Sequence, residues 1–475
     1  MTQAMFANWS FFQTPNARCE SLGADYRNSR PFGFGMSMIR LTTLSLLIMT
    51  ALNGCGPAPS GNSGTAPGAV DPSAPSSAAG STPSGGTADL IRIVSSLPRT
   101  GSARQQTDTI VNGIRMAIDE AGGKVGDFRI EYLDLDDATA SAGQWTAEAE
   151  TANAEQAVKD PDVMVYIGTY NSGAAKISMP ILNRAELLMV SPANTWPGLT
   201  KPGTGDPSEP DIYRPTGKLN YVRVVPADDL QGSLAAEWAK QMGLNKVYIL
   251  DDNEVYGRGI ANLFEERATE IGLTVLGHES IDAKAQEFKS LMVSIKAQEP
   301  DLIYFGGTTQ SKGGQIAKDM VAAGLTAKLM VPDGCMEEAF ITSAGAENIN
   351  ERCFFTFGGL PPDELKGPGK VFVEKYEAKF NGKPEAYAIY GYECARVALE
   401  AIRIAGKKDR TAITQAALSI RDFDGALGRL TFDENGDTSV KVLSGSTVRD
   451  GKFSFVQLLG QTEAAEPAGD ASAPK

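Results

Sequence analysis

Residues 91–94 read Ile-Arg-Ile-Val, and after a loop residues 109–121 read Thr-Ile-Val-Asn-Gly-Ile-Arg-Met-Ala-Ile-Asp-Glu-Ala. The first run is short and β-branched, which predicts a strand. In the second run Ile110, Ile114, Ala117 and Ile118 recur at the spacing of one helix face. A strand followed by a helix of this kind is the repeating unit of a parallel sheet that is covered on both faces. The stretch therefore predicts an α/β fold.

The same alternation of strand and helix continues along the chain and starts again near residue 221. The later strands are expected at residues 128–133, 163–167, 187–190, 221–225, 246–250, 274–278, 302–305 and 328–331, with further β-structure at 428–432 and 440–459. The later helices are expected at residues 144–158, 173–183, 230–242, 256–271, 288–298, 312–323, 372–380 and 388–405.

Two similar halves with chain crossings between them predict two Rossmann-like lobes, each with a parallel-type central sheet, around a ligand cleft. We expect lobe 1 to comprise residues 89–222 and 357–430, and lobe 2 to comprise residues 223–356 and 431–460. Three crossings would form the hinge between the lobes. They are expected near Arg223–Val225, Phe355–Phe357 and Leu430–Thr431.

The N-terminal region predicts export and lipid attachment. Arg40 precedes an apolar run over residues 41–49 that is too short to span a bilayer and is typical of a signal peptide. The region closes on Leu52-Asn53-Gly54-Cys55, which resembles a bacterial lipobox, so we expect Cys55 to carry lipid. The alternative is an ordinary signal peptide followed by a chance cysteine.

The flanking segments complete this organisation. Residues 1–35 are mixed polar, acidic and aromatic, unlike the short basic start of a signal peptide, so we interpret them as a mis-annotated leader. The signal peptide would then occupy residues 36–54. Residues 55–88 are rich in Gly, Pro, Ser and Ala and predict a flexible tether, and residues 461–475 predict a disordered tail.

Charge and histidine content exclude several classes of function. The formal net charge is −14 and no run of Lys or Arg resembles a phosphate-binding surface, so nucleic acid is not an expected partner. The chain has 1 histidine, His278. We therefore expect neither a His-based zinc site nor a catalytic Ser-His-Asp group. Ser-Lys or carboxylate catalysis stays open on sequence grounds, but no motif favours it, and we expect no enzyme activity.

No motif predicts a cofactor or a metal. The sequence lacks a dinucleotide-binding Gly-x-Gly-x-x-Gly after a strand and a phosphate-binding Gly-x4-Gly-Lys-Ser/Thr. Residues 433–437 begin like an EF-hand loop, but Thr438 and Ser444 stand where glycine and glutamate are needed. A β-turn at Asn435-Gly436 is the simpler interpretation.

The cysteines suggest one cross-link. Cys335 and Cys353 flank a short helix in the second lobe, and in an oxidising compartment they are predicted to form a disulfide. Cys394 lies in a helical pattern and is predicted to be a buried free thiol.

Several ordered blocks carry a resemblance to a known family. They are residues 113–118 with Gly122-Gly123, then 132–137, 167–168, 191–195, 256–259, 304–307 and 428–437. Together they resemble the leucine/isoleucine/valine-binding family, the type I periplasmic binding proteins that serve as solute receptors of ATP-driven amino-acid importers. The resemblance covers about residues 89–460 and implies a two-lobed fold.

The resemblance also implies how a ligand carboxylate is held. In the family a serine and a threonine with nearby backbone N–H groups bind it, and the matching residues here are Ser172 and Thr195, with Ala193 and Asn194 beside them. Ser172 precedes a helical run, where unpaired N–H groups favour an anion. The alternative for Ser172 is that it only caps its helix.

The family's ammonium partner, an acidic residue, corresponds to Asp333, although a turn aspartate before glycine is the alternative. Tyr256 and Tyr387 match aromatic positions of the family, and the alternative for Tyr387 is core packing. The sequence departs from the family at Thr308, where a pocket tyrosine is usual, and at Arg99, where an apolar residue is common. The departures leave the specificity for the ligand side chain open.

With the signal and the tether, the resemblance implies an exported, lipid-anchored solute-binding protein. We expect it to capture an amino acid, branched-chain or related, between its lobes and to deliver it to an ABC permease in the cytoplasmic membrane. It would be a monomer without a cofactor, attached to the membrane by lipid alone. The alternative is a ligand-sensing receptor subunit of the same fold for an amino acid, an amide or another small molecule.

Overall fold

Two mainly parallel sheets form the centre of the fold, which the computed structural model describes for residues 88–460. These residues all belong to one compact unit. The expected leader, signal peptide, lipidation site at Cys55 and C-terminal tail lie outside the described residues, as does almost all of the tether. No helix within residues 88–460 is long and apolar enough to cross a membrane.

The first sheet has the strand order β2-β3-β1-β6-β7-β8, and its neighbours run parallel except for β2 beside β3. Neighbouring residues of β1 belong to different hydrophobic clusters. Ile93 shares one cluster with Ile110 of α1, and Val94 shares another with Ala154 of α2. Helices therefore cover both faces, which explains why the strands read as continuous apolar runs. The strands are β1 (Leu90–Leu97), β2 (Lys124–Val125), β3 (Phe128–Asp136), β6 (Val163–Gly168), β7 (Leu188–Ser191) and β8 (Tyr221–Arg223). The associated helices are α1 (Arg104–Glu120), α2 (Ala147–Lys159), α3 (Ser172–Arg184), α10 (Pro368–Phe380), α11 (Ala388–Ala405) and α12 (Arg410–Leu418), with short 3-10 turns η1 (Pro197–Leu199), η2 (Asp211–Tyr213) and η4 (Pro362–Glu364).

The second sheet has the strand order β10-β9-β11-β12-β13-β16-β17. Its first five strands run parallel, and β16 and β17 are added antiparallel at one edge. The strands are β9 (Lys246–Asp251), β10 (Thr274–Ser280), β11 (Leu302–Gly306), β12 (Lys328–Val331), β13 (Cys353–Phe357), β16 (Leu443–Arg449) and β17 (Lys452–Leu459). The helices are α4 (Asp228–Gln241), α5 (Val255–Glu270), α6 (Lys289–Lys296), α7 (Gly313–Ala322), α8 (Glu338–Ala344) and α9 (Ala346–Ile349), with the 3-10 turn η3 (Asp333–Cys335).

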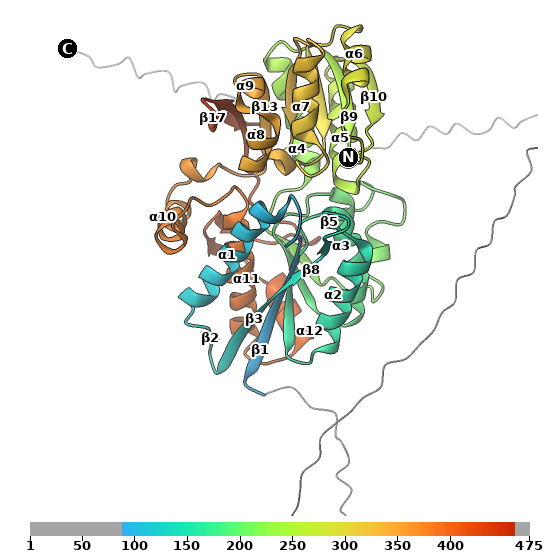
Figure 1. The fold of residues 1–475 in the computed structure, drawn as a ribbon. Coiled ribbons are helices and arrows are strands. Elements are labelled where there is room, and N and C mark those ends of the chain that lie inside the picture. Colours follow the sequence, from blue (N-terminus) through green and yellow to red (C-terminus); the bar gives the residue numbers. More distant parts are fainter. Residues whose placement is uncertain (1–87, 461–475) are drawn as a thin grey trace, which may run out of the picture. The chain divides into compact units, whose positions relative to one another are not determined.

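The chain passes between the two sheets three times. It leaves the first sheet after β8, returns after β13 to helices α10 to α12, and leaves again after the hairpin of β14 (Phe423–Gly425) and β15 (Gly428–Leu430). Figure 1 shows β1, β3 and β8 with α1, α2 and α11 in one lobe, and β9, β10 and β13 with α4 to α9 in the other. The predicted fold class, two α/β lobes with three crossings, is confirmed.

A buried ion pair joins the first crossing to the third. The fully buried Arg223 donates from Nε to Oδ1 of Asp437 at 2.7 Å, and the two residues also form a backbone bridge. Further donors of the same guanidinium reach the carbonyl oxygens of Asn194 and Trp196 and the hydroxyl of Thr200. The pair therefore also fixes the segment that follows β7.

Some predicted elements differ from the observed ones. Residues 144–145, expected at the start of a helix, form strand β5 (Gln144–Trp145), which pairs with β4 (Ala138–Thr139). Helix α2 begins only after Thr146, whose side chain caps it by accepting the N–H of Ala149. Helix α12 was not predicted from the sequence.

The predicted disulfide between Cys335 and Cys353 is wrong, because both thiols are free and buried. The register explains this: Cys353 pairs with Leu329 near the start of β12, whereas Cys335 follows the end of that strand. The two residues therefore do not face each other across the sheet. Cys394 is a buried free thiol, as predicted.

Candidate functional site

The carboxyl ends of strands from both sheets line a cleft between the lobes, the usual ligand position in α/β proteins. An inner pocket and an outer pocket share three residues, Asn171, Tyr256 and Thr308. The outer pocket is open to solvent on one side, and its empty space together with that solvent is about 450 Å³. The inner pocket is lined by Tyr170, Asn171, Ala193, Tyr256, Thr308, Asp333, Gly334 and Tyr387.

One side of the cleft offers neutral donors. Ser172 is the first residue of α3, so the unpaired N–H groups of that helix begin beside it. Its hydroxyl accepts the N–H of Trp196 at 3.4 Å, and the helix has no side-chain cap. Thr195 lines neither pocket, and its buried hydroxyl lies beside the carboxylate of Asp228, where it opposes the rise in the pKa of that group. The start of α3 with Ser172 can accommodate an anion.

Asn194 has a different position from its neighbours. Its buried amide accepts the N–H of Thr169 and donates to the carbonyl oxygens of Thr169 and Tyr170. These bonds tie the segment after β7 to the segment after β6. Asn194 therefore positions the wall of the inner pocket rather than facing into it.

Asp333 lies at the centre of the inner pocket and receives three hydrogen bonds. Tyr256 and Gln231 each donate to its Oδ1 at 2.7 Å, and Tyr387 donates to its Oδ2. Tyr387 directly precedes α11 of the first lobe, whereas the other three residues belong to the second, so this bond joins the lobes. Burial raises the pKa of Asp333, although the three donors oppose the rise.

A second buried carboxylate, Asp228, lies near Asp333. It is the first residue of α4, and neither of its carboxylate oxygens has a hydrogen-bond partner among residues 88–460. Burial, reinforced by the charge of Asp333, raises the pKa of Asp228 well above its usual range. Two buried acids without a cation between them are unfavourable unless a proton or a bound cation compensates the charge.

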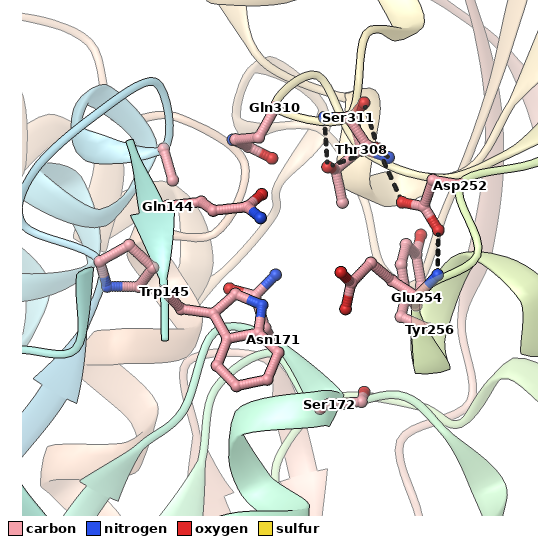
Figure 2. A pocket seen from close by; sticks show the side chains of 13 residues that line it. Gln144, Trp145, Asn171, Ser172, Asp252, Glu254, Tyr256, Thr308, Gln310 and Ser311 are labelled. Carbon is pink, nitrogen blue, oxygen red and sulfur yellow. Dashed lines mark hydrogen bonds between the residues drawn. The ribbon is translucent and has the colours of Figure 1, made fainter. Parts of the chain in front are cut away.

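The outer pocket is lined by polar side chains from both lobes. Figure 2 shows Gln144, Trp145 and Asn171 on one side of the space and Glu254 and Gln310 on the other. Deeper on the second side, Ser311 donates to Asp252 at 2.7 Å and accepts the N–H of Thr308 at 2.8 Å. None of the described residues that line either pocket is Lys, Arg or His.

A model of the periplasmic binding protein family matches residues 90–451, most of the chain. The chain belongs to the periplasmic binding protein family. Membership in this family implies an exported protein, and the resemblance inferred from the sequence is confirmed.

Individual relatives of this periplasmic binding protein agree with the family assignment. A Leu/Ile/Val-binding protein homolog of Brucella abortus is 27% identical over 381 residues, which cover 78% of this chain and 95% of the relative. The leucine-binding protein LivK of Thermotoga maritima is 27% identical in sequence, with a TM-score of 0.69 over 78% of this chain and 98% of that one. A solute-binding protein of Rhodopseudomonas palustris, solved with 3,4-dihydroxybenzoic acid, matches with a TM-score of 0.65, 21% identity and coverage of 80% and 99%.

The structure of this periplasmic binding protein brings most of the predicted site residues together. The inner pocket holds Ala193, Tyr256, Thr308, Asp333 and Tyr387, and the outer pocket adds Ser172.

Three predicted residues, Arg99, Asn194 and Thr195, line neither pocket, and Arg99 is bound elsewhere. Its guanidinium is bound by Asp108 at 2.6 Å, by Asp134 at 3.0 Å and by Thr107 at 2.9 Å, and it lines neither pocket. Because these three partners use its donors, the structure does not bring Arg99 to the ligand cleft. Its neighbours Pro98 and Ala103 reach the outer pocket instead.

Sequence reasoning missed Asp228, Gln144, Trp145 and Glu254. Asp228 is one of two adjacent aspartates, and the residue pair alone does not say which one turns inward. The sequence pattern predicts a helix over Gln144 and Trp145, which instead form strand β5. Among the described residues no group of three or more His, Cys, Asp or Glu side chains could hold a metal ion.

Proposed function

We propose that this protein captures an amino acid between its lobes and delivers it to an ABC importer. The Brucella and Thermotoga relatives are named for binding leucine or related amino acids, which supports this class of solute. Binding alone accounts for the arrangement of the cleft, so no catalytic step is needed. The protein would act as a monomer.

The observation that carries the proposal is the division of the cleft into two chemical halves. Ser172 and the start of α3 present neutral donors. Asp228 and Asp333 present buried carboxylates, and the pKa of Asp228 is raised although Thr195 and the charge of Arg223 oppose the rise. An α-amino acid carries one anion and one cation, so it can occupy both halves at once and compensate both buried acids.

The Rhodopseudomonas palustris neighbour was solved with 3,4-dihydroxybenzoic acid, but the cleft described here disfavours such a ligand. A benzoate-type ligand brings a negative charge and no cation. In this cleft it would meet Asp228, Asp252, Glu254 and Asp333 without a lining base.

Closure of the lobes would couple ligand capture to recognition by the permease. The bond from Tyr387 to Asp333 already joins the lobes, and a ligand that contacts both lobes would shift the population towards the closed form. A sensor that presents the closed form to a signalling receptor would depend on the same closure of the lobes. Permease and ATPase genes next to this gene would favour transport.

Lipid attachment at Cys55 belongs to the same proposal. The lipobox-like sequence and the following tether would hold the lobes near the membrane while leaving them free to reach the permease. Mass spectrometry of the native protein is expected to find Cys55 as an acylated N-terminus. An unmodified cysteine, or cleavage elsewhere, would contradict it.

Binding should release protons and weaken as the pH falls. Burial raises the pKa of Asp228 and of Asp333, so in the empty cleft these carboxyl groups keep their protons to a higher pH than exposed carboxyl groups do. An ammonium group pairs with the ionised form, so affinity should increase as the pH rises through the raised pKa values. Calorimetry at one pH in two buffers of different ionisation enthalpy would count the protons released. Equal heats in both buffers together with a pH-independent affinity would contradict the prediction.

A thermal-shift screen of the purified protein against the amino acids and small amides tests the proposed function. A solute that binds only the folded state raises the melting temperature by mass action. We expect at least one amino acid to do so, whereas a shift only with sugars or aromatic acids would exclude the proposed function.

A further inference from the structure

The side chain of a bound ligand would meet the outer pocket, and this pocket has an unusual supply of unpaired polar groups. The carboxylate of Glu254 makes no hydrogen bond or ion pair with the described residues, and Figure 2 shows it pointing into the space between the lobes. Its backbone is engaged: the N–H donates to Oδ1 of Asp252 at 3.0 Å, and the carbonyl oxygen accepts the N–H of Arg258 at 3.0 Å. Glu254 precedes α5 but its side chain does not cap that helix.

The amides around Glu254 also have unused capacity. The side chains of Gln144 and Asn171 face the same space and have no hydrogen-bond partner among residues 88–460. Gln310 donates from Nε2 to Glu337 at 3.1 Å, which leaves its buried Oε1 without a partner. The pocket thus offers several acceptors, one of them charged, from both lobes.

Trp145 supplies an aromatic wall in the same pocket. It lies against the start of α3, where a Cβ added to Gly173 would stand 2.7 Å from Cζ2 of the indole. The close contact fixes the ring beside the polar groups. An indole face attracts a cation.

The charge of the residues that line the outer pocket indicates which ligand side chains the pocket favours. The outer pocket includes the carboxylates of Asp252 and Glu254, and none of its described lining residues carries a positive charge. Burial raises the pKa of Glu254, which fits a carboxylate that lacks a counter-ion. A branched aliphatic side chain would leave every acceptor of this pocket unpaired, at a cost for each buried group.

We propose that the solute is an amino acid with a cationic side chain, whose ammonium or guanidinium group binds Glu254, Gln144, Asn171 and Gln310 beside Trp145. This inference rests on the proposed function, because it takes the α-amino group to be bound by Asp228 and Asp333 and the α-carboxylate by Ser172 and the start of α3. It assigns the outer pocket as the determinant of specificity. The solute would then be lysine, arginine or a shorter diamino acid rather than leucine.

The test compares lysine with norleucine. Norleucine has the same number of side-chain carbons as lysine but lacks the terminal ammonium group. Calorimetry of the purified protein is expected to show that lysine or arginine binds at least about tenfold more tightly than norleucine, leucine or glutamine. Glu254→Gln should reduce this preference for lysine over norleucine to less than about threefold while the melting temperature stays unchanged. Glu266→Gln, on the exposed face of the same helix, is the matched control and should keep the full preference.

The other outcomes separate this inference from the proposed function. If leucine or norleucine binds as tightly as lysine and Glu254→Gln changes nothing, the cationic side-chain site is wrong and the capture of an amino acid stands. If a neutral amide such as glutamine or urea binds best, independently of Glu254, the inference is likewise overturned. If no α-amino acid binds at all, the proposed function fails and the inference fails with it.

Discussion

Replacing Asp437 by alanine is expected to lower the free energy of unfolding by about 3–5 kcal/mol. The substitution removes the ion-pair partner at 2.7 Å from Arg223, whose side chain is completely buried. The remaining carbonyl and hydroxyl acceptors are neutral and cannot compensate the guanidinium charge. Urea unfolding followed by circular dichroism would measure the change.

The control for Asp437→Ala lies in the same loop. Glu434 is exposed and makes no ion pair with any residue of 88–460, so Glu434→Ala should change the stability by less than about 0.5 kcal/mol. Removing both members of the pair, with Arg223→Met and Asp437→Ala together, should cost less than the sum of the single changes. A loss of less than about 1 kcal/mol for Asp437→Ala would contradict the role given to this pair.

Removing either of the two buried carboxylates, Asp228 or Asp333, is expected to weaken amino-acid binding by at least about 2 kcal/mol. Asp333→Ala deprives the ammonium group of a buried partner. Asp228→Asn should cost at least as much, because it neutralises a fully buried carboxylate near Asp333. Thr195→Ala should cost less, because the N–H groups at the start of α3 remain. Calorimetry with the best amino acid from the screen measures each loss.

Stability distinguishes a binding role of Asp228 from a structural one. A carboxyl group whose pKa is raised in the folded state stabilises the fold only at low pH, so ionised Asp228 opposes folding near neutral pH. Asp228→Asn should therefore keep or raise the melting temperature of the empty protein while it weakens binding. Asp229→Asn, which removes only a partly exposed pair with Lys201, should bind normally. Normal binding by Asp228→Asn would exclude Asp228 from the site.

Much of the fold could be predicted because it depends on local periodicity. Helix α11 begins and ends at the predicted residues, 388 and 405, and strand β12 also matches its prediction. The two-residue strands β4 and β5 could not be found in this way, since so short a segment has no period to read. They matter because β5 carries Gln144 and Trp145 into the outer pocket.

The candidate site could be predicted where it follows strand ends, and not where it depends on partners from distant parts of the chain. Ser172 follows β6 of the first sheet, and Thr308 and Asp333 follow β11 and β12 of the second. The structure places all three at the cleft. Arg99 also follows a strand, but Asp108 and Asp134 bind its charge. The register of β12 and β13, which separates Cys335 from Cys353, is likewise invisible in the sequence.

The most direct test of the central claim, that the cleft binds the zwitterionic head of an amino acid, is calorimetry with chemically blocked ligands. The purified protein would be titrated with its best L-amino acid, with the N-acetyl derivative and with the primary amide of the same amino acid. We expect one molecule bound per protein, a loss of at least about thirtyfold on N-acetylation, which removes the cation facing Asp228 and Asp333, and a smaller loss for the amide. If the N-acetyl derivative binds as tightly as the free amino acid, the two carboxylates do not hold an ammonium group and the account of this cleft is wrong.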